Sequence, residues 1–476
     1  MCKFLIAALA ASFAAAQAPA VLEQISSRLT ANGLKADVAF LASDSLQGRG
    51  TPSPGLDAAA EFVAAQFRRA GLEPGGDDGY FQTADFAQVA PVMDGLEVSV
   101  ESGGQTVKAA PGLAIMQAAA ADVSGAPTVK VAPGAPLPPA ETLQGKVVVV
   151  EAVRGPAFAA VLAAKPALVL LLPAGGMRAT GRGPTQLREA GPAIATVPIV
   201  VVANDAALAK ALASPDAKVT AHVPAPKVNP VKLRNVIGVL RGSDPVLKDS
   251  YIIFTAHYDH LGVRENGQGT DHIFNGANDD ASGTASVMEI ATALASLPQR
   301  PKRTIVFMTL FGEEVGELGS QYYARHPMFP LAKTIADVNL EQLGRTDEVG
   351  EGTKLNQFNL TGFDYTDLPA VFQRAGKQTG VKVVKDEQKS DSYFGRSDNA
   401  AFANVGVPST TLSVTYAYGD YHAAGDEWPK LDYENMAKVD RTIALAALDL
   451  ADGTYVPKWN EANAKTEGYR KARAGK

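Results

Sequence analysis

The sequence has very little cysteine: Cys2 is the only one among 476 residues. Residues 1–18 have the features of an export signal, so we expect Cys2 to be absent from the mature chain. Without cysteine, the mature protein can form no disulfide bond, bind no metal through a thiolate and use no cysteine nucleophile. Any metal ion must therefore be bound by histidine, aspartate and glutamate side chains.

The expected signal, residues 1–18, combines a short charged start with an apolar run. Lys3 supplies the charge, residues 4–13 are almost wholly apolar, and small residues after them offer cleavage sites. The run is shorter than the ~20 residues of a membrane span and ends in polar and small residues, which favours cleavage over retention as an anchor. We expect the mature protein in the periplasm or in the medium.

Other apolar runs and clustered basic residues are also scarce. No second stretch is long and apolar enough to cross a membrane, so we expect no membrane span in the mature chain. Removal of residues 1–18 leaves 43 basic and 50 acidic residues, and this balance argues against nucleic acid as a partner. Apolar residues make up 46% of the sequence, which is enough to form a sizeable core.

The region from about residue 21 to residue 86 has the apolar spacing of helices. We expect one helix to be capped by Asp57 and to end at Gly71. The preceding segment, residues 46–51, reads L-Q-G-R-G-T and is a tight loop by its glycines.

Composition changes sharply at residues 95–229, which are rich in Ala, Val, Pro and Gly. Short strands are expected at residues 146–151, 167–172 and 197–203. This region predicts a small β-rich insertion without catalytic chemistry. The segments 19–94 and 230–476 would then form one discontinuous domain.

Apolar strands alternate with helices in the C-terminal half, which predicts an α/β fold with a mixed, largely parallel sheet covered by helices on both faces. The expected strands are residues 251–256, 304–311, 336–340 and 409–414. In such sheets, ligands bind beyond the carboxyl ends of the strands. The candidate residues lie at those ends.

The first of these strands ends in His257, followed two residues later by Asp259. His257 can bind a metal ion through one ring nitrogen, and Asp259 can accept the other ring N–H and fix the tautomer. Taken alone, the pattern also suits a hydrogen-bonded structural histidine.

Adjacent carboxylates follow in the segment N-G-A-N-D-D-A-S-G, which opens onto a helix. Asp279, Asp280 or Ser282 could cap that helix, but capping explains only one of the two carboxylates well. A carboxylate can also bridge two zinc ions ~3.5–4 Å apart.

Glutamates end the next two strands. Glu313 and Glu314 follow one strand, and their side chains should point in different directions, so one can bind a metal while the other faces the water that the metal activates. Glu341 ends the following strand. A surface loop is the alternative for Glu313 and Glu314, but adjacent carboxylates at an apolar strand end repel each other unless a cation is present.

His422 lies in a turn-rich loop after the last strand, in the segment Y-H-A-A-G-D. Four successive strand ends thus each supply a zinc-type ligand, although the chain has only six histidines. Of the other histidines, His260 and His272 could contact substrate. We expect His222 and His326 to be structural, because no carboxylate accompanies them.

These motifs together resemble the M28 family of zinc peptidases, which includes bacterial leucyl-type aminopeptidases and the glutamate carboxypeptidase branch. The matching motifs are H-Y-D, N-G-A-N-D-D-A-S-G, F-G-E-E-x-G, N-L-E and Y-H-x-x-G-D, in this order. The loop L-Q-G-R-G-T is also similar to this family, and the β-rich insertion resembles a protease-associated (PA) domain.

The resemblance implies a zinc exopeptidase fold with two zinc ions. It assigns the first zinc to His257, Asp279 and Glu314. It assigns the second zinc to Asp279, Glu341 and His422, with Asp279 as the bridge. Glu313 falls on the general-base position, and the family tends to have a cis peptide bond between Asp279 and Asp280.

Two departures from the family pattern stand out. Glu341 occupies a position where the family usually has aspartate, and it is one methylene longer. Where relatives often read S-D-H, this chain has Ser397, Asp398 and Asn399. Since that histidine is not a metal ligand in the family, we expect altered substrate contacts at Asn399.

The implied function is that of an exported zinc-dependent exopeptidase acting on peptide substrates, with an aminopeptidase favoured. Hydrolysis would use a metal-activated water and Glu313 as its proton acceptor. A carboxypeptidase or dipeptidase of the same family is one alternative, and the one-zinc glutaminyl cyclase branch is another. A catalytically silent binding module is a third, although such a protein is expected to lose ligands that this chain retains.

Overall fold

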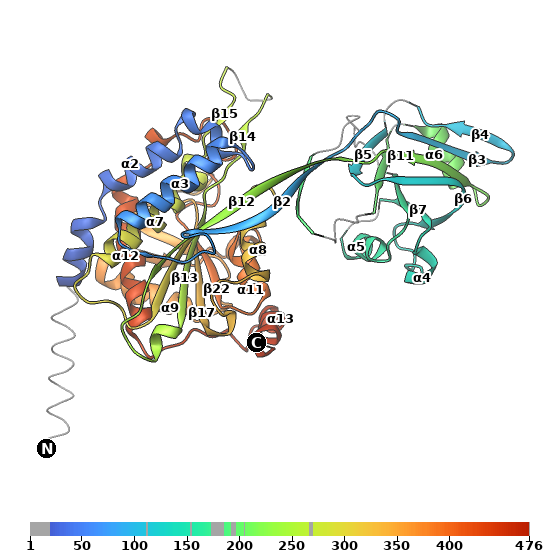
Figure 1. The fold of residues 1–476 in the computed structure, drawn as a ribbon. Coiled ribbons are helices and arrows are strands. Elements are labelled where there is room, and N and C mark those ends of the chain that lie inside the picture. The colour runs from blue at the N-terminus through green and yellow to red at the C-terminus, as the bar shows by residue number, and fades with distance from the viewer. Residues whose placement is uncertain are drawn as a thin grey trace. The chain divides into compact units, whose positions relative to one another are not determined.

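The computed structural model describes residues 20–110, 113–152, 155–172, 185–191, 197–203, 205–265 and 270–475. The expected export signal, residues 1–18, lies outside these ranges. The chain divides into two compact units (Figure 1), which we call the first unit (Met1–Ala84 with Leu233–Lys476) and the second unit (Asp85–Lys232).

The boundaries of the second unit differ from those expected at residues 95 and 229. Two long strands, β2 (Phe81–Ala90) and β12 (Lys227–Leu240), each run without interruption from one unit into the other. The expected boundaries lie where the amino-acid composition changes. The observed boundaries differ because the chain passes between the units within two continuous strands.

The first unit is built on a mixed sheet with a parallel centre. Its central strands lie in the order β22 (Ser409–Ser413), β17 (Thr334–Leu340), β13 (Tyr251–His257) and β16 (Thr304–Leu310). These four strands are parallel, and β12 pairs antiparallel with β16. All four expected strands are confirmed to within two residues. Every residue in them is buried, as a parallel sheet covered on both faces requires.

Helices cover both faces of this sheet (Figure 1). On one face, α7 (Ser282–Ala295) and α12 (Tyr433–Asp452) pack against β13, and α2 (Ala31–Leu41) packs against both helices. On the other face, Tyr323 of α8 (Leu318–Arg325) and Phe402 of α11 (Asn399–Asn404) join one apolar cluster with strand residues. The predicted α/β fold class is therefore confirmed. Among the described residues, no helix is both long and apolar enough to cross a membrane.

The helix expected from Asp57 begins three residues earlier. In α3 (Pro54–Arg69), the side chain of Ser53 accepts the hydrogen bond from the backbone N–H of Leu56, so Ser53 is the cap. Asp57 lies in the first turn instead. A proline at the first helical position is compatible with this start, because that position needs no N–H donor.

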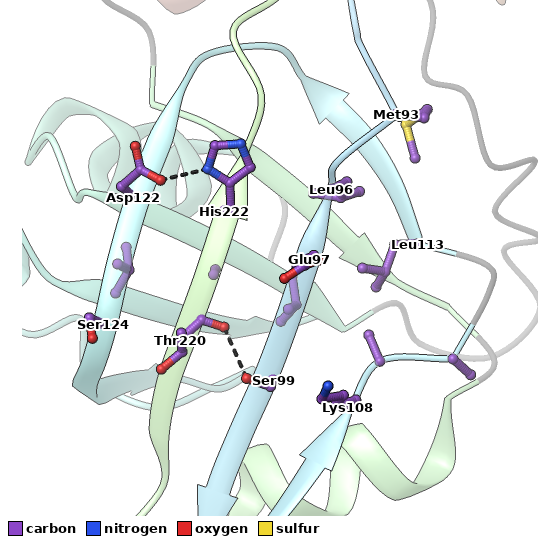
Figure 2. A pocket seen from close by; sticks show the side chains of 15 residues that line it. Met93, Leu96, Glu97, Ser99, Lys108, Leu113, Asp122, Ser124, Thr220 and His222 are labelled. Carbon is purple, nitrogen blue, oxygen red and sulfur yellow. Dashed lines mark hydrogen bonds and ion pairs between the residues drawn. The ribbon is translucent and has the colours of Figure 1, made fainter.

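The second unit contains an eight-stranded sheet that includes β7 (Val147–Glu151), β8 (Leu168–Leu172) and β10 (Ile199–Val202), close to the three strands expected there. A cavity of about 690 Å³ opens over β3 (Glu97–Ser102), β6 (Ala121–Val131) and β11 (Lys218–Val223) (Figure 2).

His222 lies in the wall of this cavity, with its Nδ1 atom 2.6 Å from Oδ1 of Asp122 (Figure 2). The expectation that no carboxylate accompanies His222 is therefore wrong. Asp122 is 100 residues away in the sequence, and pairing of β6 with β11 places it directly opposite His222. Both side chains are largely exposed, so the pair contributes little to stability.

A pair of carboxyl groups is buried between α2 and α7. Asp37 and Glu289 are each only 6% exposed. Burial, reinforced by the charge of Glu289, raises the pKa of Asp37 to about 7, although Arg69 acts in the opposite direction. Because the folded-state pKa of Asp37 exceeds its ordinary value, the folded state is favoured at low pH and loses stability as pH rises toward 7.

Asp37→Asn is therefore expected to increase the free energy of unfolding by about 2 kcal/mol near pH 8 and to change it little near pH 4. The amide keeps the shape of the side chain and cannot ionise. Urea unfolding at both pH values measures the difference, with the exposed Asp57→Asn as control. An equal effect at the two pH values would contradict the assignment.

Candidate metal centre

The candidate residues of the first unit lie on loops that leave one edge of its sheet. His257 is the last residue of β13, Glu314 follows β16, and Glu341 directly follows β17. The loop after β22 carries His422, and Asp279 precedes α7. Because the four strands are parallel neighbours, their carboxyl ends meet at the same edge.

His257, Asp279 and Glu341 form the first group of ligating side chains. One ligating atom from each lies within 4.8 Å of the others, and Nε2 of His257 is 3.3 Å from Oδ1 of Asp279. Strand register explains this proximity. Thr255 of β13 lies opposite Asn339 of β17, so the same register two residues further on brings His257 toward Glu341.

The second group forms on the other oxygen of Asp279. Nε2 of His422 lies 3.2 Å from Oδ2 of Asp279 and 3.3 Å from Oε2 of Glu314. His260 joins this group, because His260, Asp279 and Glu314 also have ligating atoms within 4.8 Å of one another. Asp279 is therefore shared by the two groups, which is the arrangement of a bridging carboxylate.

The two glutamates are exchanged relative to the assignment that the resemblance implied. Glu314 was assigned to the group of His257 but lies with His422. Glu341 was assigned to the group of His422 but lies with His257. Both β16 and β17 pair directly with β13, but Glu341 directly follows β17, whereas the chain after β16 turns at Gly312, whose φ is +70°, before it reaches Glu314.

The buried polar atoms of this centre fit a bound cation. Nε2 of His257 and Oε1 of Glu314 are buried and make no hydrogen bond of good geometry in the described part of the chain, although each lies close to another ionisable group. Burial, together with the negative charge of Asp279, raises the pKa of Glu341 to about 7. A divalent cation would compensate this accumulation of negative charge. Imidazole nitrogens and carboxylate oxygens are donors that zinc accepts.

His260, which was expected only to contact substrate, lies within the second group of ligating side chains. Its side chain is fully buried, and its Nδ1 atom lies 2.7 Å from Oε1 of Glu314. Both ring nitrogens otherwise lack hydrogen-bond partners within the described ranges. His260 therefore either binds a cation with Glu314 or holds that carboxylate in place. His272, the other histidine considered for substrate contact, is exposed and belongs to neither group.

His260→Ala is expected to weaken metal affinity by about 10- to 100-fold, the usual cost of losing a partner of a metal ligand. Competition with a chromophoric chelator measures the affinity directly. His272→Ala is the matched control, because it removes an exposed histidine of the same segment. Equal affinities in the two variants would contradict the role assigned to His260.

Asp259 links His257 to the glutamate segment. Its Oδ1 atom is 3.5 Å from Nδ1 of His257 and accepts a hydrogen bond of 3.0 Å from the backbone N–H of Glu313. Its Oδ2 atom accepts a hydrogen bond of 3.0 Å from the hydroxyl of Thr51. The backbone carbonyl of Asp259 lies closer to Nδ1 of His257, at 3.2 Å, and orients the ring, while the Asp259 carboxylate fixes the position of Glu313.

Arg49 is a central residue that sequence reasoning missed. It is fully buried, and its guanidinium donates to the backbone carbonyls of Leu41, Tyr258, Asn275 and Gly276. These carbonyls come from separate segments, two of which carry the metal ligands. Arg49 is the arginine of the L-Q-G-R-G-T motif. From the sequence, this motif was interpreted only as a tight loop.

Asp426 was likewise visible only as the last letter of Y-H-x-x-G-D. Its fully buried carboxylate accepts hydrogen bonds from the backbone N–H groups of Asn278 at 3.0 Å and Asp279 at 3.1 Å. The Tyr418 hydroxyl donates to the same carboxylate at 2.9 Å. Asp426 therefore fixes the backbone of the shared ligand.

Asp280 has a structural role, although it is adjacent to Asp279. Its Oδ1 atom accepts hydrogen bonds from the backbone N–H groups of Gly283 at 2.9 Å and Gln342 at 3.1 Å. Asp280 thus binds the first turn of α7, whose N-cap residue is Ala281, while Asp279 faces the metal groups. The peptide bond between the two residues is cis, as the resemblance implied.

Asn399 is a buried residue, and altered substrate contacts at this position stay a prediction. It is fully buried, its amide donates to the carbonyl of Phe394 at 3.0 Å, and its Oδ1 atom accepts from the hydroxyl of Thr411 at 2.7 Å. The side chain therefore holds the start of α11 against β22. Asn399 is a packing residue.

With the geometry established, comparison with known proteins identifies the family. Residues 235–447 match peptidase family M28, and this range includes every residue of the two groups. The chain carries an M28 peptidase domain. A probable zinc metalloprotease of Pyricularia oryzae is 32% identical to it over 213 residues, and the aminopeptidase YwaD of Bacillus subtilis is 24% identical over 236 residues.

The matched part is limited in both chains. It covers 43% of this chain and 39% of the Pyricularia protein, and 47% of this chain and 46% of YwaD. The chain therefore matches less than half of the length of these curated relatives. Matches of this extent support the family more strongly than any whole-protein activity.

Solved structures support the fold over almost the whole chain. The match with an aminopeptidase from Aneurinibacillus sp. strain AM-1 covers 91% of this chain and 97% of the aminopeptidase, with a TM-score of 0.57 and 20% identity. A peptidase M28 precursor from Shewanella amazonensis covers 92% of this chain with a TM-score of 0.50 and 19% identity. The M28 domain thus has the zinc exopeptidase fold that the sequence predicted.

Proposed function

We propose that this protein is a zinc-dependent exopeptidase, and specifically an aminopeptidase that releases N-terminal residues. The observation that carries the proposal is the shared carboxylate of Asp279, with one histidine near each of its oxygens. Two relatives described as a zinc metalloprotease and an aminopeptidase support the same activity.

Two zinc ions are proposed, one in each group of side chains. The first ion would be held by His257, Asp279 and Glu341. The second ion would be held by Asp279, Glu314 and His422, with His260 beside Glu314. When bound, zinc supplies Lewis-acid chemistry that activates water and polarises a peptide carbonyl.

Glu313 is the proposed general base. Its backbone is fixed by Asp259, and its side chain belongs to the same electrostatic environment as His257 and Glu341. Burial raises the pKa of Glu313 well above its ordinary value, which gives the carboxylate a higher proton affinity. Glu313 would accept the proton of the attacking water and deliver it to the leaving amine.

Export and the role of the insertion are further parts of the proposal. Residues 1–18 would direct the chain to the periplasm or the medium and then be removed. The second unit would be a PA-like domain. Detection of a mature N-terminus shortly after residue 18 in the exported fraction tests the first point.

The test of the activity compares free and N-acetylated forms of the same peptides, after the zinc content of the protein has been measured. An aminopeptidase cleaves only the free form, because the substrate amine must remain available to the acidic centre. Cleavage of blocked peptides would favour a carboxypeptidase. Absence of both zinc and hydrolysis in folded protein would favour a silent binding module.

A further inference from the structure

A small polar cavity adjoins the metal centre of the first unit. Its volume is about 30 Å³, which leaves room for roughly two or three heavy atoms. Most of the side chains around it carry hydroxyl groups. The residues that matter here are Glu341, Tyr393, Arg396, Ser397, Tyr416 and Tyr421.

Arg396, an exposed residue, supplies a positive charge to this cavity, which Glu341 also lines. Among the described residues, no carboxylate is paired with its guanidinium, which instead lies 4.3 Å from the ring centroid of Tyr393. By contrast, Arg345 is held by Asp347 at 2.6 Å and by Asp420 at 2.9 Å. An arginine that stacks on an aromatic ring keeps its N–H donors free for a planar acceptor.

Tyr416 supplies a second free donor. The residue is only 4% exposed, yet its hydroxyl has no hydrogen-bond partner in the described part of the chain. Its ring lies 4.9 Å from that of Tyr393, and its backbone N–H is bound by Glu348 at 2.9 Å. Burial raises the pKa of Tyr416, so the hydroxyl keeps its proton. A buried unpaired hydroxyl is costly unless a ligand uses it.

The cavity is connected to both metal groups. The hydroxyl of Ser397 donates a hydrogen bond to Oε2 of Glu341, a ligand in the first group. The ring of Tyr421 stacks on that of His422, a ligand in the second group, at 4.0 Å. A substrate group in the cavity would therefore lie next to the reacting peptide bond.

We propose that this cavity binds a carboxylate of the substrate, with Arg396 as the opposite charge and Tyr416 as a second hydrogen-bond donor. The inference rests on the proposed peptidase function and specifies its substrate class. Arginine pairs with planar carboxylates through charge-assisted hydrogen bonds. The carboxylate could be an acidic side chain beside the scissile bond or the C-terminal carboxylate of a dipeptide, and the two sources are separable by experiment.

The experiment measures kcat/KM of the zinc-loaded full chain on two matched pairs of substrates. Glutamyl and glutaminyl anilides differ only in the side-chain carboxylate, whereas Leu-Ala and Leu-Ala-amide differ only in the C-terminal one. We expect a preference for the charged member of one pair, and that pair identifies the source. Arg396→Gln should reduce the preference about 10- to 100-fold.

Tyr416→Phe removes only the unpaired hydroxyl, so it should fold at least as stably as the native protein while raising KM for the charged substrate. Arg68→Gln is the control, because Arg68 also stacks on a tyrosine ring of this unit, Tyr80, at 5.1 Å. Hydrolysis without preference in either pair, or a preference unchanged in Arg396→Gln, would overturn the inference and leave the peptidase function intact.

If none of the four substrates is hydrolysed, the proposed function fails and the cavity is tested by calorimetry. Glutarate should bind to the native protein, whereas its neutral analogue glutaramide and the Arg396→Gln variant should give no binding. Equal binding of glutarate to the native protein and to Arg396→Gln, or no binding to either, overturns the carboxylate site.

Discussion

Glu313→Gln is expected to keep the full metal content of the protein and to lower kcat/KM by about 10³-fold or more, the upper range for the loss of a general base. The amide has nearly the same shape as the carboxylate but cannot accept a proton. Metal binding should persist, because Glu313 belongs to neither group of ligating side chains. Zinc analysis and peptide hydrolysis on the same preparation measure both quantities.

Glu317→Gln provides the matched control for this variant. It makes the same chemical change four residues later, on a half-buried glutamate of the same segment. Activity within about twofold of the native value is expected, as for substitutions outside the catalytic machinery. A comparable loss in both variants would show that disturbance of the segment, and not removal of the proton acceptor, causes the effect of Glu313→Gln.

The edge of the sheet that carries the centre could be predicted from the sequence. Apolar strands that each end in a potential ligand are readable from hydrophobic runs and from the residue that follows them, as at His257 and Glu341. Parallel pairing then brings the strand ends together without further information. For the same reason, the fold class and the central strands were predicted correctly.

The partition of ligands could not be predicted from sequence order, because it depends on strand register and on the turn that follows β16. The sheet order places β13 between β16 and β17, with β17 in the register that brings Glu341 to His257. Glu314 precedes Glu341 in the chain but approaches from the opposite neighbour. The order of the motifs predicts which residues are ligands. Which of these ligands share a metal ion depends on how the strands and loops are arranged.

Supporting residues were missed for a different physical reason. Arg49 acts through its side chain on backbone carbonyls up to 227 residues away in the sequence. Every residue has a backbone carbonyl group, so a sequence motif cannot indicate which carbonyl groups accept these hydrogen bonds. Asp426 acts on backbone N–H groups and was hidden in the same way. Such contacts become visible only when the loops that carry the ligands are placed in space.

The partition makes a second prediction with a large effect, which concerns pairs of alanine substitutions. If His257 and Glu341 bind one zinc ion, removing both should cost only that ion, and the double variant should retain about one zinc per chain. Removing Glu314 and His422 together should likewise leave about one. Removing His257 and Glu314 should disrupt both groups and leave almost none.

The opposite partition, with Glu314 beside His257, reverses all three outcomes: the His257/Glu314 variant would retain one ion, and the His257/Glu341 and Glu314/His422 variants would retain none. Zinc analysis of the dialysed variants therefore separates the two arrangements, with circular dichroism to confirm folding. Asp279→Ala sets the lower limit, because its two oxygens lie in both groups. Activity should fall by about 10³-fold or more in every one of these variants, since each lacks part of the two-ion centre, so the metal content alone carries the distinction.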